Sequence, residues 1–261
     1  MEIKLNNKVA IVTAASDGIG LVTALTLAQS GSRVYIAARN EQKVNDIIKT
    51  HPELDLHFVE FNADKPQTFR TFVNEVYQKE KRIDILVNNY GPNIFENDLT
   101  IMDTDYNFYK EIVDKNTESA YVATQEVLKY MKQQNSGSII NISSITSVVP
   151  DVMWIAYNSA KAMLNVITQN TASVAGQFNV RCNAILPGVV WSDDLEEFAS
   201  KEFLEAALNQ TPLNKFTTRQ DVANSVLFLA SDLSQTITGQ LLELAGGYGK
   251  VTPLYSQFKN M

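Results

Sequence analysis

The sequence contains a single cysteine, Cys182, among its 261 residues, which excludes a disulfide within the chain. Residues 1–8 are polar and of mixed charge, unlike the apolar core of a signal peptide. Both features favour a protein that works in the cytoplasm. With 45% hydrophobic residues, a chain of this length buries enough apolar surface to fold without a covalent or metal cross-link.

Positive charge is also scarce. Lysine and arginine number 22 against 29 aspartates and glutamates, which gives a net charge of −7. Nucleic-acid binding proteins carry a basic patch, and anionic membranes attract polybasic segments, so neither partner is favoured. No run of about 18 apolar residues occurs, so no transmembrane helix is expected. The only histidines, His51 and His57, have no thiolate or carboxylate cluster beside them, so we expect no metal site.

What the sequence does have is a regular alternation of short, β-branched apolar runs and longer helical stretches. Continuous apolar runs such as residues 9–13 (VAIVT) are typical of strands that are buried on both faces of a parallel sheet. We expect strands at residues 9–13, 33–37, 56–61, 83–87, 138–142, 180–186 and 240–244. We expect helices at residues 18–30, 41–50, 67–79, 105–133, 155–175, 193–208 and 219–230.

This alternation predicts a single-domain α/β fold, a doubly wound parallel sheet of the Rossmann type with helices on both faces. No linker, repeat or change of composition divides residues 1–261. We also expect a lid-like segment at about 188–212 and a C-terminal tail at 248–261. Ligands of such sheets bind at the carboxyl ends of the strands, so functional residues should directly follow strands.

Residues 13–20 (TAASDGIG) follow the first expected strand and open the first expected helix. Backbone N–H groups at a helix N-terminus can hold a diphosphate, and glycine lets the phosphate approach closely. An ordinary strand-to-helix turn is the alternative. The position after the first strand favours a dinucleotide site.

The end of the second expected strand carries Ala38 and Arg39. An acidic residue at this point would bind the ribose 2′-hydroxyl of NAD, whereas a guanidinium suits the 2′-phosphate of NADP. Arg39 therefore favours NADP(H), with NAD(H) as the alternative and a solvated arginine as the non-functional interpretation. Asp17 counts against NADP, since its carboxylate would repel a phosphate.

Ser144 follows the fifth expected strand, and Tyr157 and Lys161 lie four residues apart on one face of the next helix. A phenol has a pKa of about 10, and a nearby ammonium would lower it. Tyr157 could then act as general acid–base on an alcohol or ketone, with Ser144 bound to the same oxygen. A surface Tyr–Lys pair is the alternative, which the upstream serine and the cofactor motifs disfavour.

The order and spacing of these residues resemble the short-chain dehydrogenase/reductase family over nearly the whole chain. The resemblance implies an NADP-dependent oxidoreductase that moves a hydride between the cofactor and a secondary alcohol or ketone. The catalytic residues of the family fall on Ser144, Tyr157, Lys161 and Asn116. In the family, the asparagine supports a water that relays protons through the lysine.

The same resemblance implies a set of cofactor-binding residues. They fall on Thr13, Ser16, Asp17, Gly18, Ile19, Arg39, Asn62, Asn89, Gly91, Tyr157, Lys161, Pro187, Gly188, Val190 and Ser192. The chain departs from the family pattern at two positions. Ala14 replaces the first glycine of the TGxxxGxG motif, and Asn62 replaces the acidic residue that many members carry on the adenine side.

Within the family, the chain looks most like the bacterial 7α-hydroxysteroid dehydrogenases. The segments that carry this likeness are 88–91, 155–157, 168–170, 181–184, 245–247 and 252–255. The likeness implies NADP dependence, action on the 7α-hydroxyl of a bile acid or related steroid, and a homotetramer. The small residues Ser159, Ala160 and Ala162 would permit close helix packing between subunits.

The expected substrate residues are Ser144, Tyr157, Asn93, Trp154 and Trp191. Further apolar walls are expected from Ile94, Met153, Val190 and the tail around Tyr255. These walls suit an apolar alcohol or ketone, but they could instead belong to the core or to a subunit interface.

Other interpretations of the sequence stay open. The amphipathic segment 193–208 suits a closing lid or a static helix. The protein could instead reduce another carbonyl, such as a 3-oxoacyl thioester or a sugar. It could also be a non-catalytic NADP sensor, which the intact catalytic set disfavours.

Overall fold

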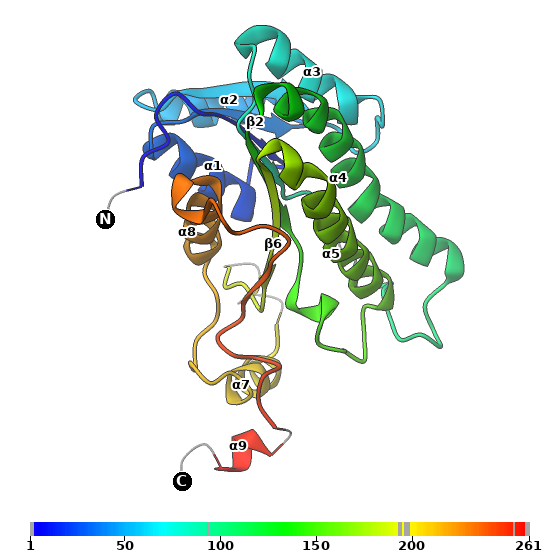
Figure 1. The fold of residues 1–261 in the computed structure, drawn as a ribbon. Helices are drawn as coiled ribbons and strands as arrows, with labels where there is room; N and C mark the ends of the chain where they lie inside the picture. The colour runs from blue at the N-terminus through cyan, green and yellow to red at the C-terminus, as the bar shows by residue number, and fades with distance from the viewer. Residues whose placement is uncertain are drawn as a thin grey trace.

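The computed structural model describes residues 3–92, 94, 96–192, 195, 199–252 and 254–258. In this part of the chain, seven strands form one parallel sheet in the order β3-β2-β1-β4-β5-β6-β7 (Figure 1). The strands are β1 (Val9–Thr13), β2 (Arg33–Ala38), β3 (Leu56–Glu60), β4 (Ile85–Asn88), β5 (Gly137–Ile142), β6 (Val180–Pro187) and β7 (Leu241–Leu244). The strand order reverses between β1 and β4, which is the switch point where sheets of this class bind ligands.

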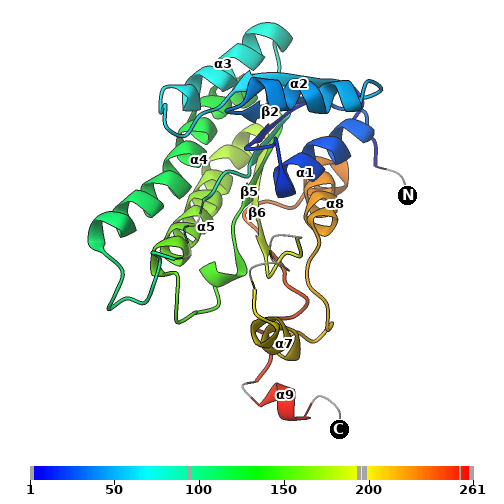
Figure 2. The same cartoon turned by 180° about the vertical axis from the view of Figure 1, so that it is seen from behind.

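Helices cover both faces of the sheet (Figures 1 and 2). One face is covered by α1 (Gly18–Gln29), α2 (Glu41–Thr50) and α8 (Arg219–Ala230). The other face is covered by α3 (Thr68–Glu80), α4 (Tyr106–Gln134) and α5 (Ile155–Ala175). Beyond the carboxyl ends of the strands lie α7 (Lys201–Asn209) and α9 (Tyr255–Phe258).

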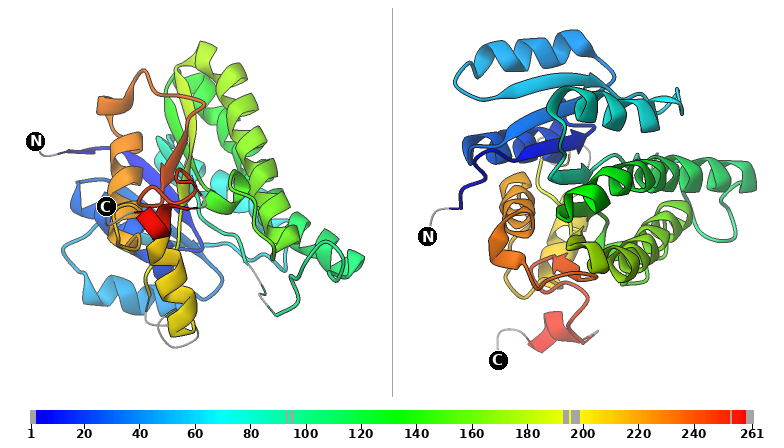
Figure 3. Two further views of the ribbon diagram at one scale, coloured as in Figure 1. Left: turned by 90° about the horizontal axis from the view of Figure 1, so that it is seen from below. Right: turned by 45° about the horizontal axis from the view of Figure 1, so that its top comes forward.

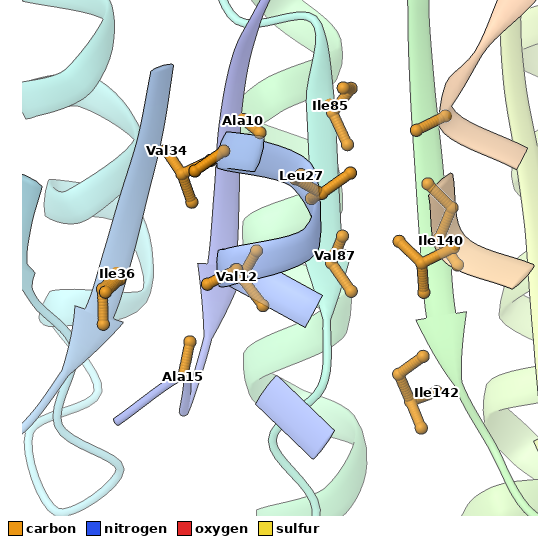
Figure 4. Close-up of a cluster of buried hydrophobic side chains, with 14 of the residues drawn as sticks. Ala10, Val12, Ala15, Leu27, Val34, Ile36, Ile85, Val87, Ile140 and Ile142 are labelled. Carbon is orange, nitrogen blue, oxygen red and sulfur yellow. The ribbon is translucent and has the colours of Figure 1, made fainter. Parts of the chain in front are cut away.

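Successive residues of each strand point to opposite faces and enter two separate hydrophobic clusters. In β1, Ala10 and Val12 belong to the cluster under α1 and α8, while Val9 and Ile11 belong to the cluster under α3 and α4. Figure 4 shows the first cluster, in which Leu27 of α1 lies over side chains from several strands. Burial on both faces explains why the strands are near-continuous apolar runs in the sequence.

The expected doubly wound α/β fold is confirmed. The expectation of one continuous helix over residues 193–208 is wrong. Ala199 and Ser200 are not helical, and α7 begins only after Ser200, whose Oγ accepts the Phe203 N–H at 3.1 Å. An N-terminal serine cap of this kind starts a new helix where hydrophobic periodicity alone would continue the old one. Residues 193, 194 and 196–198 lie outside the described residues.

Three further features bear on function. Among the described residues, no helix combines the length and apolarity needed to cross a membrane. In the same part of the chain, no three or more His, Cys, Asp or Glu side chains gather as a metal site. Cys182 is buried in β6, and burial raises the pKa of its thiol to about 12, so it is not a reactive nucleophile.

Candidate active site

The loops that follow β1, β4 and β5 meet at one edge of the sheet, because these three strands are neighbours. Figure 3 (left) views the molecule from this side. The register places the end of β4 beside both other strands, with Val87 opposite Val12 and Asn88 opposite Asn141. The glycine loop (residues 13–20), the Asn88-Asn89-Tyr90-Gly91 segment at the end of β4 and Ser144 therefore lie at one edge, as their positions after strands predict.

Ser144, Tyr157 and Lys161 come together at this edge. Ser144 lies close enough to Tyr157 for a side-chain hydrogen bond that lowers the phenol pKa, and Lys161 Nζ lies 5.3 Å from the centroid of the Tyr157 ring. Lys161 Nζ donates to the Ile142 carbonyl at 3.1 Å, and Ser143 Oγ donates to the Lys161 carbonyl at 3.1 Å. These two bonds hold α5 against the end of β5, which is what brings Tyr157 to Ser144.

Burial controls the titration of this group. It raises the pKa of Tyr157 to about 12, an effect that the hydrogen bond with Ser144 opposes. It lowers the pKa of the Lys161 ammonium to about 8. The hydrogen bond with Ser144 is the interaction that opposes burial in this structure. Lys161 Nζ lies over the Tyr157 ring, and the lowering of the phenol pKa by its ammonium stays a prediction.

Asn116 of α4 lies beside Lys161. Its Nδ2 donates to the carbonyls of Pro92 (2.7 Å) and Ile112 (3.0 Å), while its buried Oδ1 has no hydrogen-bond partner. A Cβ on Gly91 would lie 2.7 Å from Asn116 Oδ1 and closer still to Lys161 Nζ. The glycine therefore keeps open a space that both polar atoms border. An orphaned buried oxygen next to an ammonium is a suitable site for a bridging water.

The glycine loop between β1 and α1 is tied to the loop after β4. Thr13 Oγ1 accepts the N–H groups of Asn89 (2.9 Å) and Tyr90 (3.2 Å), and Asn89 Nδ2 donates to the Thr13 carbonyl (3.1 Å). A Cβ on Gly20 would lie 2.6 Å from Asn89 Nδ2, so only glycine permits this approach. Thr13 and Asn89 thus fix the shape of the glycine loop through hydrogen bonds to its backbone and to the loop after β4.

Gly18 leaves the N-terminus of α1 open. Its φ is +56°, and no heavy atom lies within 4 Å of the position a Cβ would take. Ser16 and Ile19 flank it and are half-buried. Ala14 has a φ of 52°, a left-handed conformation that costs a non-glycine residue about 1 kcal/mol. The loop therefore keeps a backbone suited to glycine, and it fits the diphosphate of a dinucleotide.

Arg39 lies directly after β2 with its side chain exposed. Lys43, which the sequence patterns did not single out, lies in the first turn of α2, and its Nζ is 2.7 Å from Asp17 Oδ2. The other Asp17 oxygen accepts the Gly18 N–H at 2.7 Å. The hydrogen bonds from Lys43 and Gly18 lower the pKa of Asp17. The Asp17 charge is therefore compensated, which weakens the objection that it would repel a phosphate.

Asn62 follows β3 and closes a short loop. Its Oδ1 accepts the Asp64 N–H at 3.0 Å, and its backbone N–H donates to Thr68 Oγ1 at 3.1 Å. Its side-chain oxygen is therefore hydrogen-bonded within the loop.

The segment after β6 forms the opposite wall. Pro187 is the last residue of β6, and a Cβ on Gly188 would lie 2.9 Å from the Ala245 side chain. Val190 forms an isolated parallel bridge with Thr217. Ser192 is half-buried, and its Oγ accepts the Leu195 N–H at 3.1 Å. The segment that carries the expected cofactor residues Pro187, Gly188, Val190 and Ser192 is thus held close to β7.

The expected substrate residues are less closely assembled. Trp191 is 36% exposed and stacks on Phe216 with ring centroids 5.7 Å apart. Trp154 precedes α5 in a left-handed conformation with φ 64°. Ile94, expected as a further wall, is 43% exposed. Asn93 lies outside the described residues. The described members therefore border the edge from separate loops without forming one closed pocket.

Asp98 is a site residue that sequence reasoning missed. Its carboxylate is fully buried, and its two oxygens accept the N–H groups of Ala156 (2.9 Å) and Tyr157 (2.8 Å). Its carbonyl accepts the Trp154 N–H at 3.1 Å. This carboxylate caps α5 from 58 residues away and fixes the turn that carries Tyr157. The signal was the absence of a capping side chain before Ile155.

Asp98→Ala is expected to destabilise the protein by about 3 kcal/mol, because two buried N–H groups at the start of α5 lose their acceptor. Asp98→Asn keeps one acceptor oxygen and should lose about half as much. Urea unfolding of the two variants and of the parent protein measures the difference. Equal unfolding midpoints for all three would show that Asp98 does not cap α5.

Comparison with known proteins agrees with this geometry. A family model described as "Enoyl-(Acyl carrier protein) reductase" matches residues 13–249, a range that includes every loop of the site described above. The crystal structure of gox2181 superposes with a TM-score of 0.89 at 26% identity, covering 96% of this chain and 98% of the other.

Curated relatives carry two different activities in their names. The 7alpha-hydroxysteroid dehydrogenase of Clostridium sardiniense is 42% identical over 259 residues, which is 98% of each chain. The 3-oxoacyl-[acyl-carrier-protein] reductase FabG of Aquifex aeolicus is 33% identical over 250 residues, 95% of this chain and 99% of the relative.

Proposed function

The chain belongs to the short-chain dehydrogenase/reductase family of oxidoreductases, and on this premise we propose that it oxidises or forms the 7α-hydroxyl of a bile acid or related steroid with NADP(H). The observation that carries the proposal is the meeting of Ser144, Tyr157 and Lys161 beside the open N-terminus of α1. The identity with the Clostridium sardiniense enzyme supports the steroid substrate. The cytoplasm is the proposed setting.

The chemistry of the site divides between the cofactor and the chain. When bound, the nicotinamide supplies or accepts the hydride. Ser144 and Tyr157 would hold the substrate oxygen between their hydroxyls, and Tyr157 would give or take its proton. Lys161 and the free Oδ1 of Asn116 border the space through which a water could carry that proton to solvent.

The preference for NADP(H) over NAD(H) rests on the end of β2. Ala38 and Arg39 occupy the position where a carboxylate would bind a ribose 2′-hydroxyl, and Arg39 is exposed. Asp17 is already paired with Lys43, so its charge need not repel a 2′-phosphate. Thr13, Ser16, Gly18 and Asn89 would then line the diphosphate.

The steroid proposal is supported by apolar side chains on the segments that follow the strands. Exposed hydrophobic residues occur in several of them, namely Ile94, Val152, Trp191, Phe203 and Leu254. Exposed apolar groups on loops beside a candidate site are typical of a surface that receives an apolar ligand. Trp154 and Trp191 are proposed to contact the substrate.

A second candidate is reduction of a 3-oxoacyl thioester, which the likeness to the Aquifex aeolicus reductase favours. The net charge of −7 weakly disfavours docking of an acidic carrier protein. A non-catalytic NADP sensor has no need of the acid–base pair at Tyr157 and Lys161.

We also propose a homotetramer. Exposed apolar side chains lie on the neighbouring helices α4 and α5, namely Tyr121, Met163, Val166 and Val174. Burying such a face between subunits removes it from water. Sedimentation of the purified protein at several concentrations measures the assembly, and a monomer throughout would contradict it.

The substrate is tested by supplying the purified protein with NADP⁺ and a panel of bile acids that differ only in hydroxyl position. We expect reduced cofactor to form with 7α-hydroxy substrates alone. Oxidation of NADPH by a 3-oxoacyl thioester in a parallel assay, with no bile-acid turnover, would favour the second candidate. Cofactor binding without turnover of either class would move the substrate to another alcohol or carbonyl.

A further inference from the structure

The turn between β5 and α5 carries a hydroxyl that contacts the catalytic serine. Thr146 lies in the short 3-10 helix η1 (Ile145–Ser147), two residues after Ser144. Its Oγ1 lies 2.9 Å from Ser144 Oγ, and its backbone N–H donates to the same oxygen at 3.2 Å. Because Ser144 is only 8% exposed, these contacts are shielded from solvent.

The turn is held in place from α5. Ser147 Oγ donates to the Ser144 carbonyl, and Asn165 Nδ2 donates to Ser147 Oγ at 2.8 Å. The Val148 N–H donates to the Ile145 carbonyl at 3.1 Å and completes the turn. The contact between Thr146 and Ser144 is therefore part of a fixed local structure.

The Ser144 hydroxyl has a limited capacity for hydrogen bonds: one proton to donate and two lone pairs to accept. The Thr146 N–H occupies one lone pair. If the Thr146 hydroxyl donates as well, both lone pairs are filled, and the single Ser144 proton is left for Tyr157. If Ser144 donates to Thr146 instead, it has no proton for Tyr157 or for a substrate oxygen.

We propose that Thr146 is a positioning residue whose hydroxyl donates to Ser144 and thereby directs the only Ser144 proton toward Tyr157, or toward the substrate oxygen when substrate is bound. The inference rests on the dehydrogenase chemistry proposed above. An ionised phenol only accepts hydrogen bonds, so the chain Thr146 to Ser144 to Tyr157 has one direction whenever Tyr157 acts as a base. Hydrogen bonds in such a chain strengthen one another in a buried site.

Thr146→Val keeps the shape of the side chain but removes its donor. Ser144 then regains a lone pair and can accept the Tyr157 proton, which stabilises the neutral phenol. The pKa of Tyr157 is expected to rise by about 0.5 to 1 pH unit, and kcat for alcohol oxidation to fall about three- to tenfold at fixed pH. Thr146→Ser keeps the hydroxyl and should restore both values.

The test is a pH titration by NMR of cofactor-bound protein labelled with ¹³C at the tyrosine Cζ. Loss of one resonance in Tyr157→Phe identifies Tyr157 among the ten tyrosines. Thr71→Val, on the outer side of α3, is the matched control and should leave the titration unchanged. Thr146→Ala serves as the second donor-free variant if valine lowers the thermal stability.

A raised Tyr157 pKa in the valine or alanine variant, with rescue by serine, supports the proposal. The same pKa in all variants would overturn it, as would a raised pKa that serine does not restore. The titration needs no substrate, so it separates this inference from the proposed function. If bile acids are turned over but the Tyr157 pKa is the same in all variants, only the role of Thr146 is contradicted. If the Tyr157 pKa rises as expected but bile acids are not turned over, only the steroid substrate is contradicted.

Discussion

Tyr157→Phe is expected to lower kcat by about 10³- to 10⁴-fold while leaving the cofactor dissociation constant within about threefold. Phenylalanine keeps the ring beside Lys161 but removes the hydroxyl that would exchange a proton with the substrate oxygen. Because the substitution affects proton transfer and not the loop at Gly18, it should lower turnover without weakening cofactor binding. Steady-state rates and the fluorescence of bound NADPH measure the two effects.

Tyr77→Phe is a matched control, because Tyr77 lies on α3 and stacks on Tyr130, away from the site. The pH dependence provides a second check. Burial raises the pKa of Tyr157 to about 12, so the phenolate that serves as base becomes more populated as the pH rises. Alcohol oxidation by the parent protein should therefore accelerate with pH, and the variant should lose that rise. Undiminished turnover in Tyr157→Phe would remove Tyr157 from the mechanism.

Arg39→Asp is expected to shift the ratio of the NADPH and NADH dissociation constants by about 10²- to 10³-fold toward NADH. The substitution removes a guanidinium that would pair with the 2′-phosphate. It also places a carboxylate at the end of β2, where it can accept from a ribose 2′-hydroxyl and repel a phosphate. Fluorescence titration with each cofactor gives the ratio without any substrate.

Lys132→Asp makes the same change of net charge at the far end of α4, where the ammonium lies over the Phe178 ring. It should leave the cofactor ratio within about twofold, since it is remote from β2 and screened by salt. An unchanged ratio in Arg39→Asp would show that Arg39 does not bind the 2′-phosphate. Equal shifts in both variants would assign the effect to net charge.

Local patterns in the sequence were sufficient for much of the site. Continuous apolar runs marked the strands, and the rule that ligands bind after strands pointed to Thr13, Asn89 and Ser144. The four-residue spacing of Tyr157 and Lys161 placed both on one face of a helix. The strands and helices could be placed in this way because helix and strand periods are properties of consecutive residues, which any chain displays in its sequence.

Other features depend on residues that are distant in the sequence. Asp98 caps α5 across 58 residues, and Lys43 pairs with Asp17 across 26. Neither contact produces a periodic pattern of residues in the sequence. The start of a new helix after Ser200 was also not predicted from the sequence, because an amphipathic pattern can continue through a residue whose hydroxyl caps a new helix.

The sequence by itself determined the doubly wound sheet, the edge at which the candidate site lies and the residue types of the candidate catalytic set. Only the tertiary structure decided how those residues behave. Burial sets the direction of the Tyr157 pKa shift, and the turn that carries Thr146 places a second hydroxyl beside Ser144. Desolvation and hydrogen-bond direction depend on everything packed around a group, and that environment exists only once distant segments of the chain have met.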